Sequence, residues 1–308
     1  MDQAAKLHPG IGKICAIYDK AVAVQPVTIE EERKCDMKKY ELTDETLEIG
    51  MTTLHRIKAL VAFADVEIGD TGGWVEKESN LNQDGNAWVY GNARVYGNAR
   101  VYGNARVYGN ACVYGNAKVY GNASVYGNAR VYGNVWAYGN ACVHGNASVY
   151  GNACVSGNVW VYGNACVYGN ACVYGNVWAY NNACVYGDAC VYGNARVYGD
   201  AGVYGNAWVY GNARVCGNAY VYGNAHYMTI SPIGSRNDTI TFARDKQGRI
   251  FANVGCFYGS LSEFRAKVRN THGDNNHAKA YLLAAQLAEL RLDTTPIEDK
   301  QEDGCNED

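Results

Sequence analysis

Long apolar runs and zinc-type cysteine spacing are both missing from this sequence, and each absence excludes a class of protein. No run of 18 apolar residues occurs in the 308-residue chain, which argues against a membrane-spanning helix. The N-terminus lacks the basic and then apolar pattern of a secretory signal. No CxxC pair or Cys/His cluster has the spacing of a zinc site. We therefore expect a cytoplasmic protein without a membrane segment or a structural zinc.

Charge is also scarce. The net charge is −3, and the central part of the chain, residues 85–226, has seven cationic and two acidic residues, 7 − 2 = +5. A net positive charge of this size, spread over so many residues, is too small to indicate a nucleic-acid binding surface. Twelve cysteines would suggest a disulfide scaffold in a small secreted protein. Seven of them occupy one position of a repeat, so amplification of the repeat explains them better.

The repeat is a six-residue unit, Gly-Asn-Ala-x-Val-Tyr, that recurs 24 times from Gly85 to His226 without insertion or deletion. A short fixed period is typical of a stacked solenoid. On a strand, Ala and Val point to one face, whereas x and Tyr point outward. Gly-Asn favours a corner with positive φ. Each unit is therefore expected to form a four-residue strand and a corner.

This pattern resembles the hexapeptide-repeat family of left-handed parallel β-helices. The resemblance implies an all-β solenoid in which three units form a triangular coil of 18 residues, so that 24 units give about eight coils. The left hand and the triangle are implied by the resemblance alone. The exchanges Val135-Trp136-Ala137 and Val177-Trp178-Ala179 keep the interior volume constant, as a packed core requires.

Residues one coil apart form outward rows. Tyrosine follows Val in most of the units. Stacking of these rings between coils favours a structural role for them. Cys154, Cys172 and Cys190 form a row about 4.8 Å apart. Such thiols could bind a soft metal ion or oxidise to a disulfide, or serve only as small, weakly polar surface residues. A carbohydrate, phenolic or nucleic-acid ligand across the Tyr/Trp/Arg surface is a further alternative.

Two segments flank the repeats. Residues 1–36 are expected to be an unfolded extension, with Met37 as a second natural start. Residues 37–84 are expected to form an N-terminal β cap, in which Trp74 is either a lid or a ligand platform.

After His226 the period stops, and residues 227–292 are expected to form a ββαα module. The predicted strands are Thr239–Phe242 and Arg249–Val254. Ser260 and Glu263 form a capping box that opens a helix to about Asn270. A second helix is predicted from about Asn275 to Leu292, and residues 293–308 are expected to be a disordered acidic tail.

The motifs outside the repeats carry a closer resemblance. They are Gly72-Gly73-Trp74-Val75, residues 232–238, Gly255-Cys256-Phe257 and residues 271–275. They are similar to a group of bacterial and prophage-borne repeat proteins that are described as acyltransferase-like and have no established activity. The resemblance implies acetyl-CoA as cofactor, a His base and often a trimer, so a homo-oligomer is an open alternative. His226 is the candidate base, but it has no evident carboxylate partner and the repeats extrude no loop.

A second set of candidates lies in the C-terminal module. Cys256, His272 and Asp274 have the residue types of a thiol nucleophile, a base and an orienting group. Ser235 and Arg236 are candidates for binding an anion near a turn. A structural alternative explains Cys256, His272 and Asp274 equally well: the cysteine is a buried strand residue, and Asp274 caps the N-terminus of a helix.

The monotony of the repeats favours a non-enzymatic role. Near-identical units offer the same surface many times, which suits a scaffold or spacer. We therefore expect a structural or binding protein without a cofactor, whose protein partner is recognised by the C-terminal module. The alternatives are an acyl-CoA-dependent acyltransferase and a basic aromatic rod that binds nucleic acid or carbohydrate.

Overall fold

The computed structural model describes residues 37–297. The predicted extension 1–36 and the end of the predicted tail, residues 298–308, lie outside the described residues. From Lys39 onward the described chain forms one compact unit. Neither α-helix in the described part is both long and apolar enough to cross a membrane.

The repeats form three parallel sheets, with each strand paired to the strand one coil later. The largest sheet contains β5 (Arg94–Val95), β8 (Cys112–Val113), β11 (Arg130–Val131), β14 (Ser148–Val149), β17 (Cys166–Val167), β20 (Cys184–Val185), β23 (Gly202–Val203) and β26 (Tyr220–Val221). The eight-stranded sheet contains β4 (Trp88–Val89), β7 (Arg106–Val107), β10 (Ser124–Val125), β13 (Cys142–Val143), β16 (Trp160–Val161), β19 (Trp178–Asn181), β22 (Arg196–Gly199) and β25 (Arg214–Val215). The seven-stranded sheet contains β6 (Arg100–Val101), β9 (Lys118–Val119), β12 (Trp136–Gly139), β15 (Cys154–Gly157), β18 (Cys172–Gly175), β21 (Cys190–Gly193) and β24 (Trp208–Val209).

The strand register confirms the predicted coil. Trp88 pairs with Arg106 and Val89 with Val107, a separation of 18 residues that recurs along the eight-stranded sheet. The paired strands give about eight coils, as predicted. The repeat Ala and Val residues are buried and form one continuous core. Most strands contain only x and Val, shorter than the predicted four residues, because the regular strand ends before Tyr and the chain turns at Gly-Asn.

Glycine supplies the positive φ at the corners. Gly133, for example, has a φ of 79°, and the following Asn does not share this conformation. Asn181 occupies a Gly slot and adopts a φ of 61°. The corner asparagines instead form ladders of amide hydrogen bonds between coils, such as Asn104 Nδ2 to Asn122 Oδ1 at 3.1 Å. The ladders add polar contacts between coils that the sequence analysis did not foresee.

The backbone hydrogen bonds give the solenoid a polarity. Arg106 N donates to Ala123 O at 2.9 Å and Tyr108 N donates to Val125 O at 3.0 Å. Amide N–H groups thus point toward the following coil throughout the array. The first coil is therefore left with unpaired carbonyls and the last coil with unpaired N–H groups, and burying either without a partner is costly.

Donors from the N-terminal segment meet the carbonyls of the first coil. The segment comprises β1 (Tyr40–Ile49), β2 (Thr52–Ala59), β3 (Thr71–Val75) and η2 (Glu78–Asn80). Lys39 Nζ donates to Ala87 O at 2.9 Å, and Asn80 Nδ2 donates to Ala99 O at 2.9 Å. β3 pairs in parallel with β5, so the largest sheet continues into this segment.

Two tryptophans at this end are covered rather than exposed. Trp88 holds an outward repeat position, yet its ring packs edge-on against Tyr40 and Phe63 and is 1% exposed. Trp74 pairs with Arg94 and lies under the guanidinium of Arg56 at 4.9 Å. The interior end of the coil is closed by Tyr40 and its neighbours.

The C-terminal module is an antiparallel sheet covered by two helices, as predicted in outline. Its strands are β27 (Tyr227–Ile233), β28 (Asp238–Arg244), β29 (Ile250–Val254) and β30 (Phe257–Ser260). The sheet thus has two more strands than the sequence analysis assigns, because β27 and β30 show no clear period-2 pattern. The helices are α3 (Leu261–His272), opened by the predicted capping box, and α4 (Asn276–Arg291). The cap of α4 is Asn275, which corrects the assignment of Asp274 to that role.

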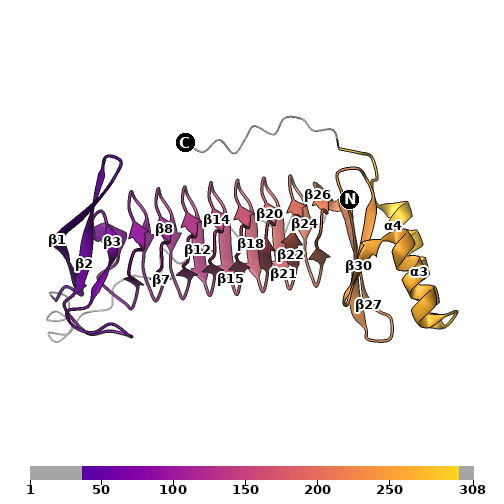
Figure 1. Cartoon of the computed structure of the whole chain (residues 1–308), viewed down its shortest axis with the longest axis horizontal. Coiled ribbons are helices and arrows are strands. Elements are labelled where there is room, and N and C mark those ends of the chain that lie inside the picture. The colour runs from indigo at the N-terminus through magenta and orange to yellow at the C-terminus, as the bar shows by residue number, and fades with distance from the viewer. Residues whose placement is uncertain (1–36, 298–308) are drawn as a thin grey trace, which may run out of the picture. The chain divides into compact units, whose positions relative to one another are not determined.

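Acceptors from the module meet the N–H groups of the last coil. Thr241 Oγ1 accepts from Arg214 N at 2.9 Å, and Asn224 Oδ1 accepts from Trp208 N at 2.8 Å. Asn224 lies in η3 (Asn224–His226), which ends the repeats. Figure 1 shows the resulting order, with the coils between the β1–β3 segment and the module that carries α3 and α4. The first residue of the predicted tail is held as well, because Asp293 N donates to Ala225 O at 3.0 Å.

Candidate functional site

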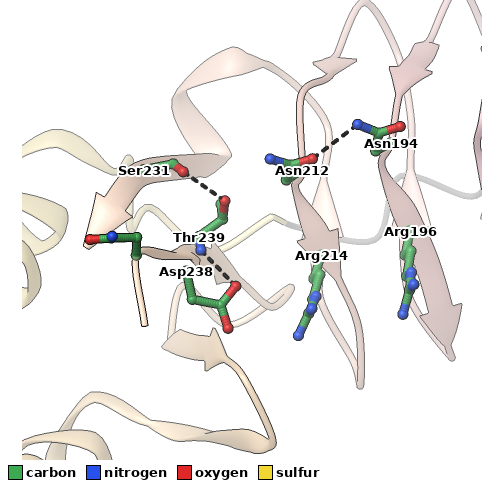
Figure 2. Close-up of a pocket in the computed structure, with 8 residues that line it drawn as sticks. Asn194, Arg196, Asn212, Arg214, Ser231, Asp238 and Thr239 are labelled. Atoms are coloured by element: carbon green, nitrogen blue, oxygen red, sulfur yellow. Dashed lines mark hydrogen bonds between the residues drawn. The ribbon is translucent and has the colours of Figure 1, made fainter. Parts of the chain in front are cut away.

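A polar cleft of about 230 Å³ lies where the last two coils meet the C-terminal module. One wall comes from β22, β25 and the corners before them, and the other from β27, β28 and the turn between them. Figure 2 shows these side chains around the cleft, which is lined by Asn194, Arg196, Asn212, Arg214, Ser231, Asn237, Asp238 and Thr239. We refer to these eight residues as the polar cleft.

The array wall of the polar cleft presents two arginines in register. Arg196 pairs with Arg214 one coil later, so their side chains run alongside each other (Figure 2). Arg196 stacks over Trp178 at 5.3 Å, and Arg214 Nη1 donates to Gly255 O at 2.8 Å. Within residues 37–297 neither guanidinium forms an ion pair. Each guanidinium therefore keeps donors available to a ligand.

One of the asparagine ladders ends at the same wall of the polar cleft. Asn194 Nδ2 donates to Asn212 Oδ1 at 3.1 Å, as the ladder requires. The repeats end at η3, before a further coil could supply the next asparagine of this ladder. In the described part of the chain, Nδ2 of Asn212 consequently has no acceptor and faces the cleft. The array wall thus offers hydrogen-bond donors from three side chains.

The module wall mixes hydroxyl groups and one carboxylate. Thr239 Oγ1 donates to Ser231 Oγ at 2.9 Å, and Asp238 Oδ1 accepts from Thr239 N at 2.8 Å (Figure 2). Asn237 supports the tight turn before β28 with a φ of 50°. A ligand in the cleft would meet a carboxylate on this side and two guanidinium groups on the other.

The predicted anion site, Ser235 and Arg236, lies in the turn that also supplies Asn237 and Asp238. Both predicted residues are exposed, and neither lines the polar cleft. The guanidinium of Arg236 lies instead beside Gly255. Sequence reasoning therefore pointed to this turn but not to its cleft residues. The signal it lacked was the packing of β28 against β25 and β26, which no local pattern encodes.

Cys256, His272 and Asp274 occupy three separate places in the module. Cys256 lies exposed in the turn between β29 and β30, whereas His272 ends α3 and Asp274 follows it. The His272 ring contacts the rings of His277 and Tyr281. In the described part of the chain no hydrogen bond joins any two of the three candidates. The arrangement therefore lacks the thiol–imidazole contact of an activated nucleophile.

His226 has a carboxylate partner that sequence reasoning missed. Its Nε2 lies 3.7 Å from Asp293 Oδ2, while Nδ1 accepts from Tyr222 N at 3.1 Å. In the neutral ring the proton must therefore be on Nε2, and neither nitrogen has a lone pair available for a substrate. Burial and the nearby Arg244 hold the pKa of His226 below its usual value, against the opposing effect of Asp293. The ring serves as another acceptor for the N–H groups of the last coil.

His144, the other repeat histidine, replaces a tyrosine in a stack. Its ring lies between Tyr126 at 4.6 Å and Tyr162 at 5.0 Å, nearly parallel to both. The Nε2 atom is buried and has no hydrogen-bond partner in the described structure. Burial lowers the pKa of His144. The imidazole is half-buried between two phenol rings, and its Nε2 atom has no access to a substrate.

The tyrosine rows are closed stacks. Ring centroids lie 5.0 Å apart for Tyr96 and Tyr114 and 4.7 Å apart for Tyr102 and Tyr120, with planes within 3° of parallel. Trp160 and Trp178 also stack, at 5.9 Å. Ring faces inside these stacks contact each other, although Trp160 and Tyr210 remain 40% and 50% exposed. A sugar ring or a base stacks on an open aromatic face, which such rows do not offer.

The cysteine rows are formed as predicted. Cys154 pairs with Cys172 and Cys172 with Cys190, and Cys166 pairs with Cys184 on the largest sheet. All five are half-buried, and none of the nine described cysteines is in a disulfide. No group of three or more His, Cys, Asp or Glu side chains in residues 37–297 converges as a metal site. Three thiols in a row do not surround a common centre.

Comparison with known proteins identifies the repeat type. A family model described as the YdcK beta solenoid repeat matches residues 87–103, 99–115, 123–139, 147–163 and 189–205. The chain is also 36% identical over 62 residues to an Escherichia coli (strain K12) protein named "Uncharacterized acetyltransferase YdcK". That match covers 18% of this chain and spans only 19% of the relative's length. The five matched stretches are thus similar to the YdcK solenoid repeat, in agreement with the hexapeptide-repeat resemblance.

Proposed function

We propose that this chain is a non-enzymatic binding protein, in which a β-solenoid scaffold presents the polar cleft to an acidic segment of a protein partner. The observation that carries the proposal is the donor wall formed by Arg196, Arg214 and Asn212. Paired guanidinium groups bind carboxylates through two parallel N–H···O bonds. Asp238 on the opposite wall adds an acceptor for an N–H or O–H group of the same ligand.

The size of the polar cleft favours a side chain over a cofactor. Its volume of about 230 Å³ is below the roughly 300–1,000 Å³ typical of small-molecule sites. A glutamate or aspartate side chain fits such a space, whereas most of a molecule as large as acetyl-CoA would stay outside. The cleft therefore suits the recognition of one or two acidic residues on a larger partner.

The array supplies the scaffold for this site. Successive coils have nearly the same composition and hold the β1–β3 segment and the module at opposite ends of the stack (Figure 1). Because the aromatic rows stack on themselves, the array gives little support to ligand binding along its length. We assign the array a spacing role and the cleft the recognition role.

A labelled acidic peptide tests the cleft directly. Fluorescence anisotropy of fluorescein-hexaglutamate with the full chain is expected to show binding at physiological salt, whereas hexaglutamine does not bind. Arg196→Ala and Arg214→Ala should each weaken binding roughly tenfold, because a charge-assisted hydrogen bond contributes about 1.5 kcal/mol or more. Arg100→Ala is the matched control, since Arg100 is exposed on the seven-stranded sheet away from the cleft.

Three results would contradict the proposal. If hexaglutamate does not bind, the proposed binding of acidic segments is wrong. If hexaglutamine binds equally well, the carboxylates do not contribute to recognition. An equal loss in Arg100→Ala would show that the peptide follows general basic charge instead of the polar cleft.

Acyl transfer is the second candidate, because the E. coli relative is named an acetyltransferase. Calorimetry of the full chain with acetyl-CoA is expected to give no binding heat, since the polar cleft is too small to enclose most of that molecule. Binding that is lost in His226→Ala, in a chain that still folds by circular dichroism, would favour the enzyme instead.

A further inference from the structure

The paired thiols on the array have a geometry of their own, independent of the polar cleft. Cys172 in β18 pairs directly with Cys190 in β21, and Cys166 in β17 pairs with Cys184 in β20. Parallel strands in register hold equivalent side chains about 4.8 Å apart. Each pair therefore presents two half-buried thiols side by side on an outer surface.

The thiols of each pair also contact each other. A hydrogen bond between Cys172 and Cys190 lowers the pKa of Cys172 to about 7, and one between Cys166 and Cys184 does the same for Cys166. The same contact raises the pKa of Cys190. By contrast, Cys112 lies between Arg94 and Arg130 without a thiol neighbour, and burial raises its pKa. Pairing thus places two thiols within reach of one ion, which Cys112 lacks.

The strand spacing discriminates between the reactions open to a pair of thiols. A disulfide needs Cβ atoms about 3.8 Å apart, so oxidation would pull neighbouring coils together by roughly 1 Å. A tetrahedral zinc site needs four ligands around one centre, whereas the described residues offer no converging group of even three. Two metal–thiolate bonds of about 2.3 Å each, the length found in zinc sites, span about 4.6 Å end to end. That span is close to the roughly 4.8 Å at which paired strands hold equivalent residues.

We infer that Cys172 with Cys190, and Cys166 with Cys184, each bind one soft monovalent cation of the Cu(I) type in linear coordination between two thiolates. Soft thiolate ligands select such ions over zinc and harder metals. Binding replaces two thiol protons: one cation and two S–H groups give one S–metal–S bridge and release two protons. No electron is transferred. Each bridge links two adjacent coils.

Silver(I) is the probe, because it has the same charge and coordination preference without redox chemistry. The full chain is loaded with Ag(I) in an excess of N-acetylcysteine and separated by gel filtration, and retained silver is measured by mass spectrometry. The monothiol removes silver from single cysteines, whereas a paired site keeps it through its high effective thiol concentration. Cys172→Ser and Cys184→Ser are each expected to retain one ion fewer than the wild type, and the double variant two fewer.

Two further variants define the geometry. Cys112→Ser, which removes an unpaired thiol of similar exposure, is expected to retain as much silver as the wild type. Cys190→Ser should also retain it, because Cys154 pairs with Cys172 from the other side. In Cys172→Ser the two remaining thiols of the row lie two strands apart, too far for one ion.

The inference is wrong if Cys172→Ser and Cys184→Ser retain as much silver as the wild type while their circular dichroism is unchanged. Equal loss in Cys112→Ser would show binding to single thiols. Retention of Zn(II) that depends on Cys172 would contradict linear coordination. None of these results bears on hexaglutamate binding, so the two proposals fail separately.

Discussion

Replacing Val149 by Asp is expected to lower the free energy of unfolding by more than about 4 kcal/mol. Val149 is fully buried in the solenoid core, where it pairs with Val131 and Val167 of the neighbouring coils. A carboxylate there would be surrounded by Ala and Val side chains and would have no partner. Because the coils stabilise one another, a defect in the middle of the array weakens both halves. Urea unfolding followed by circular dichroism measures the loss.

The neighbouring residue provides the matched control for this substitution. Ser148→Asp adds the same charge one position earlier, where the side chain points outward and pairs with Arg130. We expect a change within about 0.5 kcal/mol, typical of a surface substitution. Similar losses for the two variants would mean that Val and x do not point to opposite faces, and the assignment of the core would be wrong.

Replacing Asn80 by Leu is expected to cost about 3 kcal/mol. Asn80 is fully buried, and its Nδ2 donates to the carbonyls of Gly97 and Ala99, while its Oδ1 accepts from Lys77 N. Leucine has a similar size but leaves two carbonyls and one N–H group without partners. Each buried polar group left unsatisfied costs about 1–3 kcal/mol. Urea unfolding gives the total loss, and hydrogen exchange locates it in the coil that contains Gly97.

A ladder asparagine supplies the comparison. Asn128→Leu removes two exposed amide contacts, with Asn110 and Asn146, but leaves no buried group unpaired. We expect a loss below about 1 kcal/mol, because water replaces both contacts. If Asn80→Leu costs no more than Asn128→Leu, the first coil does not depend on donors from the N-terminal segment.

The array could be predicted from the repeats, because each unit contains the residues that specify its own strand and its own corner. Alternation of Ala and Val assigns the interior, and Gly supplies the corner conformation at every sixth residue. Capping chemistry is equally local, and the Ser260–Glu263 box was predicted correctly. The strands β27 and β30 escaped prediction because they lack alternation, although each pairs with the next strand in the chain.

The candidate site was only partly accessible to sequence reasoning. The turn at Ser235 and Arg236 was singled out, yet the cleft is formed by Asp238, Arg196 and Arg214. Arg214 and Thr241 come together although 27 residues separate them. His226 was considered as a catalytic base, but its contacts with Tyr222 and Asp293 make it an end cap. Each of these roles depends on a partner residue that cannot be identified from a local sequence pattern.

The sequence alone determined the buried Ala and Val and the outward x and Tyr, because a strand's alternation and a fixed period suffice to place them. The coil of 18 residues, and with it the rows of tyrosine and cysteine, followed from the resemblance to the hexapeptide-repeat family. Only the tertiary structure decided how the two ends of the array are closed and where a cleft forms. The physical reason is the polarity of the backbone hydrogen bonds. Carbonyls unpaired at one end require donors such as Asn80, and N–H groups unpaired at the other require acceptors such as Thr241. These partners come from segments outside the repeat, and folding alone brings them into place.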